Sequence, residues 1–145
     1  MNDALIKNWN SFVHKNDTVY ILGDLCHHIK VEECNELIKQ LKGHKRLIRG
    51  NHDKDYDPDL FDGIYDFLEL KGRCQTTISL MHYPMVEWPK SRHGGIHLHG
   101  HQHNGPEYNL QQKEQGINRY DVGIDANDYR PVSLEEILAF MGVEK

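Results

Sequence analysis

The sequence lacks any long apolar run. None of its 145 residues fall in a stretch approaching the roughly 20 apolar residues that a membrane-spanning helix needs, and no segment has the pattern of a secretory signal peptide. An excess of positive charge is also lacking, since the formal net charge is −5. We therefore expect neither a membrane partner nor an extended nucleic-acid-binding surface. A phosphate ester is not excluded as a substrate, because bound cations would reverse the local field.

Cysteine is scarce. The three cysteines, Cys26, Cys34 and Cys74, are odd in number, and no two of them have the C-x-x-C spacing of a zinc ribbon. This usage argues against a disulfide framework and indicates reduced thiols in a cytosol. The sequence thus predicts a cytoplasmic protein.

The length and the 38% content of hydrophobic residues fit one soluble domain, residues 1–145, with a substantial core. Helical periodicity predicts helices at 2–14 and 31–41. A final helix should begin after Ser133, which forms a capping box with Glu136. Its expected buried stripe comprises Leu134, Ile137, Leu138 and Met141.

Short β-rich runs alternate with the first helices and dominate the second half of the chain. The expected strands are 18–22, 46–49, 64–70, 74–81, 96–99 and 118–124. Residues 104–117 are polar and poor in β formers, which favours a loop or a loose hairpin. This order predicts a layered α/β fold with two facing mixed sheets flanked by helices.

Two histidines follow the expected strand 96–99. His101 and His103 come directly after Gly100, and residues two apart in an extended chain share one face. They can therefore point at one spot, as a pair of metal ligands must. A solvated histidine-rich turn would have the same sequence, so this pair alone leaves both interpretations open.

Three other expected strands end in the same way. Strand 18–22 runs into Gly23-Asp24, strand 46–49 into Gly-Asn-His-Asp at 50–53, and strand 74–81 into His82. Each places a metal-competent side chain just past the carboxyl end of a strand, where open α/β sheets hold their sites. Four such ends in order favour a site over coincidence.

The acidic segment between 53 and 63 has a different explanation. Its five aspartates suggest a calcium loop, but Pro58 stands where such a loop needs glycine and Ile64 where it needs glutamate. A solvated loop with a short turn of helix fits better.

The ordered motifs resemble those of the calcineurin-like metallophosphoesterases, with Gly-Asn-His-Asp at 50–53 the most specific. The segment 121–137 is similar to small bacterial and phage members. The resemblance implies a metal-dependent hydrolase that cleaves a phosphate mono- or diester, with a small phosphate ester or nucleotide as substrate.

The resemblance also implies a ligand set. Asp24 would bridge two divalent metals, because a carboxylate has two oxygens. The ligands implied for one metal are Asp24, Asn51, His82 and His101, and His103 would serve the second. This oxygen and nitrogen set favours Mn, Fe, Co, Ni or Zn over soft metals; the family points to Mn or Fe.

His52 would do the chemistry beside the metals. In proteins of this kind the corresponding histidine meets the phosphate or the leaving group and acts as a general acid. Asp53 would orient it and keep it protonated, although Asp53 can equally cap the following turn. No motif role is evident for His27, His28, His93, His97 and His99, for which surface or supporting positions are the default.

The family's Asp-x-His motif is missing, because no aspartate of this chain is followed two residues later by histidine. The strand that carries this motif would precede helix 2–14, so we expect a truncated or shortened member whose first strand is absent. One metal site would be intact, and the other would keep only Asp24 and His103, so the missing motif would impair the activity of this chain. The exposed sheet edge predicts a homo-oligomer, a partner segment along that edge, or marginal stability.

Two alternatives to an active phosphoesterase follow from this gap. One is a non-catalytic member that acts as an interaction module, and the other is a protein that binds a single metal.

Overall fold

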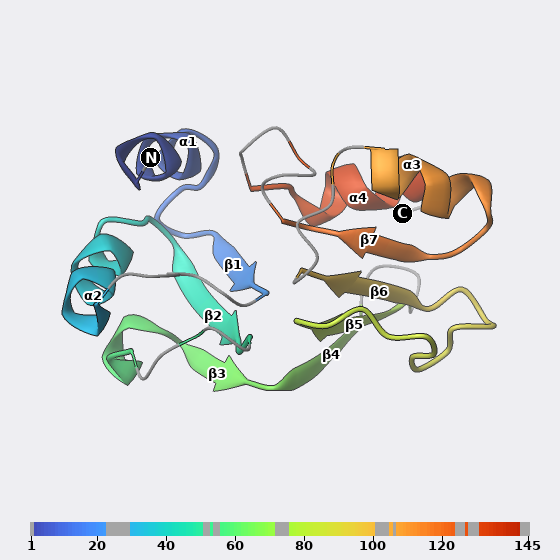
Figure 1. The fold of residues 1–145 in the computed structure, drawn as a ribbon, viewed down its shortest axis with the longest axis horizontal. Coiled ribbons are helices and arrows are strands. Elements are labelled where there is room, and N and C mark those ends of the chain that lie inside the picture. The colour runs from blue at the N-terminus through green and yellow to red at the C-terminus, as the bar shows by residue number, and fades with distance from the viewer. Residues whose placement is uncertain are drawn as a thin grey trace.

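The structure is a computed structural model that describes residues 2–22, 30–50, 53, 56–71, 76–100, 105, 107–123, 127 and 131–142. The chain forms an α/β fold with two sheets and flanking helices, which confirms the predicted fold class. Figure 1 shows the two sheets beside each other, with the first two helices near one sheet and the last two near the other. No helix in the described part of the chain has the length and apolarity needed to cross a membrane.

The first sheet is parallel and has the order β1-β2-β3. It is formed by β1 (Thr18–Ile21), β2 (His44–Ile48) and β3 (Gly63–Tyr65). Helices α1 (Asn2–Phe12) and α2 (Val31–Lys39) precede β1 and β2 in the chain, and the 3-10 turn η1 (Pro58–Leu60) precedes β3. Among the described strands β1 lies at one edge of this sheet, with β2 as its neighbour.

The second sheet is mixed and has the order β4-β5-β6-β7. It is formed by β4 (Phe67–Lys71), β5 (Thr77–Met81), β6 (Ile96–His99) and β7 (Arg119–Asp121). The pair β4–β5 is antiparallel, whereas β5, β6 and β7 run parallel to one another. Helix α3 (Glu107–Glu114) lies between β6 and β7 in the chain, and α4 (Leu134–Met141) follows β7.

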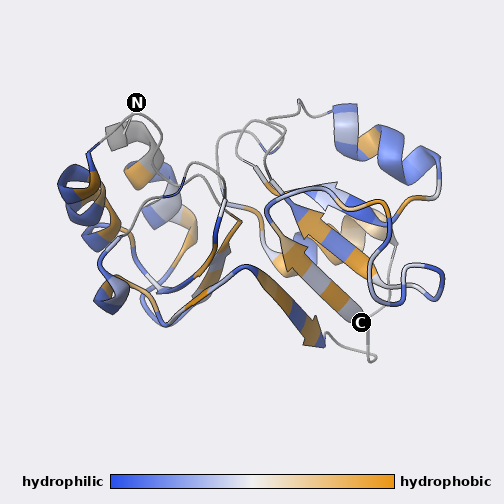
Figure 2. Cartoon of the chain, turned by 60° about the horizontal axis from the view of Figure 1, so that its bottom comes forward, coloured by the Kyte–Doolittle hydropathy of each residue, from blue (hydrophilic) through white to orange (hydrophobic). Residues whose placement is uncertain are grey.

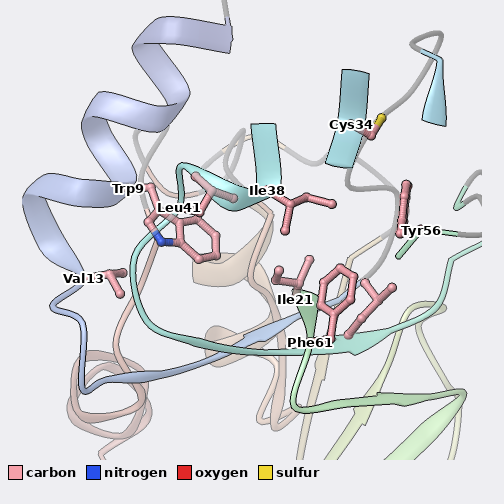
Figure 3. Close-up of a cluster of buried hydrophobic side chains, with 9 residues drawn as sticks. Trp9, Val13, Ile21, Cys34, Ile38, Leu41, Tyr56 and Phe61 are labelled. Carbon is pink, nitrogen blue, oxygen red and sulfur yellow. The ribbon is translucent and has the colours of Figure 1, made fainter. Parts of the chain in front are cut away.

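Two apolar clusters hold these layers together. The first lies between the first sheet and the first two helices, and Figure 3 shows Trp9 from α1 and Val13, just past its end, beside Ile38 from α2 and Ile21 from β1. The second cluster joins the ends of the first sheet, through Leu22 and Ile48, to β5, β6, β7 and α4. Burial of these side chains is the main force that fixes the sheets against each other.

The predicted helix 2–14, strand 18–22 and helix 31–41 are confirmed to within a few residues as α1, β1 and α2. Two apolar side chains of the helices nevertheless lie on the surface: Phe12 of α1 is 53% exposed, and Leu134 of the predicted stripe is 38% exposed. Each stands at an end of its helix, where fewer neighbouring elements cover it. Ile137 and Leu138 are buried as expected, and the capping box of Ser133 and Glu136 is present.

The predicted single strand 64–70 is wrong, because the chain changes sheets at Asp66. Tyr65 ends β3 and pairs with β2, whereas Phe67 begins β4 and pairs with β5. Tyr65, Leu68 and Leu70 all pack on the second cluster. The three-residue step from Tyr65 to Leu68 breaks the two-residue period of one continuous strand, so a bend must separate the two segments.

The predicted loop at 104–117 is also wrong, because residues 107–114 form α3. Figure 2 shows this helix as hydrophilic along almost its whole length. Its sheet-facing side chains are polar: Asn109 and Gln112 are buried. Asn109 donates from Nδ2 to the Asp121 carbonyl at 3.2 Å and accepts at Oδ1 from the Asp121 amide at 2.9 Å. Since polar contacts hold α3 in place, hydrophobic periodicity could not reveal it.

Replacing Asn109 tests this account of α3. We expect Asn109→Leu to lower the free energy of unfolding by about 1–3 kcal/mol, because the buried amide of Asp121 loses its acceptor. Gln111→Leu, on the exposed side of the same helix, is the matched control and should change stability by less than about 0.5 kcal/mol. Urea unfolding of the two variants measures the difference, and equal stabilities would contradict the anchoring role of Asn109.

Candidate functional site

The carboxyl ends of strands from both sheets meet at one place. In Figure 1 the arrowheads of β1 and β2 point toward the second sheet, and those of β6 and β7 point back toward the first. The carbonyl of Leu22, just past β1, lies 2.8 Å from Nδ1 of His82, just past β5. The amide of Gly100, just past β6, donates to the His82 carbonyl at 3.0 Å. Three of the four motif-bearing strand ends are therefore in direct contact.

His82 is held in one orientation at this junction. Its side chain is 1% exposed, and a carbonyl oxygen can only accept a hydrogen bond, so Nδ1 must carry the proton that it donates to Leu22. A lone pair available to a metal would then lie on Nε2. A histidine whose Nδ1–H is fixed by a backbone carbonyl has the usual arrangement of a metal ligand that binds through Nε2. The donor chemistry of His82 thus fits the predicted metal.

Gly100 is packed too closely for any other residue. A Cβ at this position would lie 2.9 Å from the Leu22 carbonyl and 3.8 Å from His82 Nδ1. The backbones of β1 and β6 can approach because this residue has no side chain. The glycine before His101 therefore serves the contact between strand ends, a role that its sequence position alone could not reveal.

The ends of the Gly-Asn-His-Asp motif are also joined. The Asp53 carboxylate accepts from the Gly50 amide at 2.6 Å, and the Asp53 amide donates to the Gly50 carbonyl at 3.3 Å. The other carboxylate oxygen of Asp53 accepts from the hydroxyl of Tyr56 at 2.9 Å. These contacts match the capping role considered for Asp53. Its orientation of His52 stays a prediction.

Most of the predicted site residues lie outside the described residues. These are Asp24, Asn51, His52, His101 and His103. His82 is the one described member of the predicted ligand set, and within the described ranges no three histidine, cysteine or carboxylate side chains form a cluster able to hold a metal. The ligand assignments therefore stay predictions, which rest on the position of each residue in the sequence shortly after a strand.

His97 and His99 are completely buried, so a surface position is wrong for both. They project from the face of β6 that points away from the second apolar cluster, and their ring centroids are 5.4 Å apart. His97 Nδ1 lies 3.2 Å from the Ser79 carbonyl, and its Nε2 accepts from the Met85 amide at 3.0 Å. Sequence analysis missed them because the alternation of apolar residues and histidines over 96–99 is typical of a half-buried strand, whereas this strand is buried on both faces.

Burial makes His97 hard to protonate. It lowers the pKa of His97 to about 4 from an ordinary value of 6.5, assisted by His99 and the positive charge of Arg119 and opposed by the carbonyls of Ser79 and Tyr83. Burial likewise lowers the pKa of His99. Both rings are therefore neutral at pH 7.

This shift predicts a loss of stability in acid. Above pH 6.5 both the folded and the unfolded chain hold His97 neutral; as the pH falls toward 4 the unfolded chain binds the proton first. The free energy of unfolding should therefore fall between about pH 6.5 and pH 4, by up to about 3 kcal/mol from this residue. Urea titrations of metal-free protein across this range, with His97→Gln and the exposed control His93→Gln, measure it. If the free energy of unfolding falls as steeply with decreasing pH in His97→Gln as in the unchanged chain, His97 is not the cause of the pH dependence.

A cavity of about 240 Å³ lies elsewhere, at the amino end of β7. Lys113, Arg119 and Phe140 are among its lining residues. Because β7 is parallel to β6, this end of the strand is opposite to the carboxyl ends that meet at His82. The cavity is thus separate from the candidate site.

Comparison with known proteins decides the family. The family model of the calcineurin-like phosphoesterases matches residues 2–126, most of the chain. The chain belongs to the calcineurin-like phosphoesterase family. This membership confirms the resemblance drawn from the ordered motifs, and the meeting strand ends lie within the matched region.

Proteins similar to this chain come from an archaeon and from phages. The chain is 37% identical to the uncharacterized protein MJ1445 of Methanocaldococcus jannaschii over 142 residues, 95% of this chain and 73% of that protein. It is 31% identical to the gene 66 protein of Mycobacterium phage L5, over 92% of this chain and 77% of that protein. The crystal structure of AQ665, a protein of unknown function from Aquifex aeolicus, is similar with a TM-score of 0.73 and 29% identity, covering 94% of this chain and 82% of that one.

Proposed function

We propose that this calcineurin-like phosphoesterase chain hydrolyses a phosphate mono- or diester with the help of divalent metal ions. The observation that carries the proposal is the junction of Leu22, His82 and Gly100, from which the segments of Asp24 and His101 depart. Each of these two predicted ligands stands no more than two residues from a junction residue. A chain of a few residues spans only several ångströms. The two ligands and His82 can therefore reach a common point.

The proposed ligands of the intact site are Asp24, Asn51, His82 and His101. Asp24 and His103 would hold a second metal, for which the given sequence offers fewer ligands because it has no Asp-x-His motif. Mn or Fe is our choice, with Zn, Co or Ni as alternatives. Bound metals of this kind polarise phosphoryl oxygens and generate hydroxide at neutral pH.

The chain's own residues would complete the reaction. His52, as a protonated imidazole, would donate a proton to the leaving oxygen. Asp53, which accepts from the Gly50 amide and the Tyr56 hydroxyl, would orient His52. His82, whose Nδ1 is fixed by the Leu22 carbonyl, would offer Nε2 to the metal. The substrate would be a small phosphate ester or a nucleotide, since a net charge of −5 offers no broad surface for a nucleic acid.

Turnover and metal content test the proposal together. The purified chain is assayed with p-nitrophenyl phosphate and its bis ester, with added Mn²⁺ and after chelation, alongside elemental analysis. We expect hydrolysis that depends on Mn²⁺. Bound metal without turnover of either ester would favour the single-metal or interaction alternative. A chain that neither binds metal nor turns over would contradict the proposal.

A further inference from the structure

A buried polar layer covers the outer face of the second sheet and reaches the candidate site. Its members include His99 from β6, Asp121 from β7 and Asn109 from α3, each less than 5% exposed. His99 is the last residue of β6 and comes directly before Gly100 and the predicted ligand His101.

The ring of His99 links α3 to the backbone of Gly100. Its Nδ1 lies 2.9 Å from the Gly100 carbonyl, so Nδ1 must carry the donated proton. Its Nε2 then accepts, and the hydroxyl of Tyr108 lies 3.0 Å away to donate to it. The rings of His99 and Tyr108 meet edge to face, with an angle of 89° between their planes. The tautomer of His99 is thus fixed from both sides.

Gly100 is consequently held at both of its backbone polar groups. Its amide donates to the carbonyl of His82 at 3.0 Å, and its carbonyl accepts from His99 at 2.9 Å. A Cβ on Gly100 would lie 2.9 Å from the Leu22 carbonyl oxygen, so this side of the residue is closed as well. The carbonyl of Gly100 belongs to the peptide group that continues into His101, so the His99 bond sets the plane of that peptide.

We infer that His99 and Tyr108 are positioning residues of the metal site: they hold the Gly100 carbonyl and so set the direction in which the chain departs toward His101. The inference rests on the proposed function, because it concerns the same ligands. The inference also assigns a supporting role to α3. A largely polar helix whose Tyr108 reaches the end of β6 supports the site from behind, as groups that orient metal ligands do.

Removing one hydroxyl tests the inference with little disturbance of the core. We expect Tyr108→Phe to raise the Mn²⁺ dissociation constant, measured by titration calorimetry, by about 10-fold, the lower end of the usual effect of such supporting groups. Tyr20→Phe is the matched control, because it also deletes a half-buried hydroxyl, one that accepts from Arg46 at 3.3 Å in the first sheet. Its metal affinity should equal that of the unchanged chain.

Variants of His99 separate positioning from simple packing. The side-chain amide of asparagine can replace Nδ1–H as a donor to the Gly100 carbonyl, whereas leucine cannot. We expect His99→Leu to weaken Mn²⁺ binding by about 10- to 100-fold, His99→Asn to restore a large part of it, and Tyr108→Phe to add no further loss in the His99→Leu background. Nitrogen-15 NMR of metal-free protein should show His99 protonated at Nδ1, with an Nε2 signal that moves in Tyr108→Phe.

The outcomes are distinct. Normal affinity in Tyr108→Phe and His99→Leu, or equal losses in Tyr108→Phe and Tyr20→Phe, would overturn the inference while the proposed function stands. So would failure of His99→Asn to bind better than His99→Leu, or a His99 ring protonated at Nε2. An unchanged chain that binds no Mn²⁺ would overturn the proposed function, and the positioning role with it.

Discussion

Replacing His82 is expected to abolish tight metal binding at the intact site. Its Nε2 would be one of four ligand atoms, and the loss should exceed the 10- to 100-fold that is typical for residues behind the ligands. Calorimetry with Mn²⁺ and elemental analysis of His82→Ala measure it. Asp24→Ala should give the same result. Unchanged metal content in both variants would show that the ligands are wrongly assigned.

A second substitution separates ligand loss from damage to the fold. His82→Ala removes Nδ1 as well, which leaves the buried carbonyl of Leu22 without the donor at 2.8 Å. His82→Asn keeps a donor near the position of Nδ1 but has no atom at Nε2. We expect both variants to lose metal and His82→Asn to be the more stable in urea. Tight Mn²⁺ binding by His82→Asn would contradict ligation through Nε2.

Replacing His52 is expected to reduce turnover without removing metal. If His52 is the general acid, His52→Ala should lower kcat by about 10²–10⁴-fold, the usual contribution of such a group. Elemental analysis should give wild-type metal content. Loss of metal together with rate would make His52 a ligand, and an unchanged rate would show that it takes no part.

The leaving group provides a control for His52. Because an acidic phenol needs little protonation as it departs, p-nitrophenyl esters should be less affected by His52→Ala than esters with a basic alkyl leaving group. The ratio of the two losses measures proton donation itself. Equal losses with both kinds of ester would contradict the role of general acid.

The order of elements and their apolar faces could be predicted because they follow from local chemistry. The strands β1, β2, β5 and β6 appear where apolar β-rich runs end in glycine or histidine. Helix α2 appears where Cys34 and Ile38 share one side, and both are fully buried. In these segments the periodicity of the sequence and the burial in the fold have the same cause.

The missed features depend on contacts that are distant in the sequence. The bend at Asp66 exists because the segment before it pairs with one sheet and the segment after it pairs with the other. Helix α3 is held by the polar contacts of Asn109 with β7 and of Tyr108 with β6. Neither leaves a local pattern. His97 and His99 are likewise buried because segments distant in the sequence, among them α3 with Tyr108, cover their face of β6.

The candidate site was predictable in part. His82 could be predicted as a ligand because it directly follows an expected strand. Its hydrogen bond to the Leu22 carbonyl, which fixes its tautomer, could not be predicted from the spacing of residues in the sequence. The sequence shows Gly100 directly before His101, but the close approach of this glycine to the Leu22 carbonyl depends on how the two sheets face each other. The roles of Asp24, Asn51, His101 and His103 stay predictions.

The central claim is that a metal binds where the strand ends meet, through Nε2 of His82. Anomalous diffraction from a crystal soaked in Mn²⁺, recorded above and below the Mn absorption edge, tests it most directly. We predict an anomalous peak at bonding distance, about 2 Å, from Nε2 of His82, and no such peak in crystals of His82→Asn. A peak elsewhere, or a His82 ring whose Nε2 meets no metal at saturating Mn²⁺, would contradict the claim.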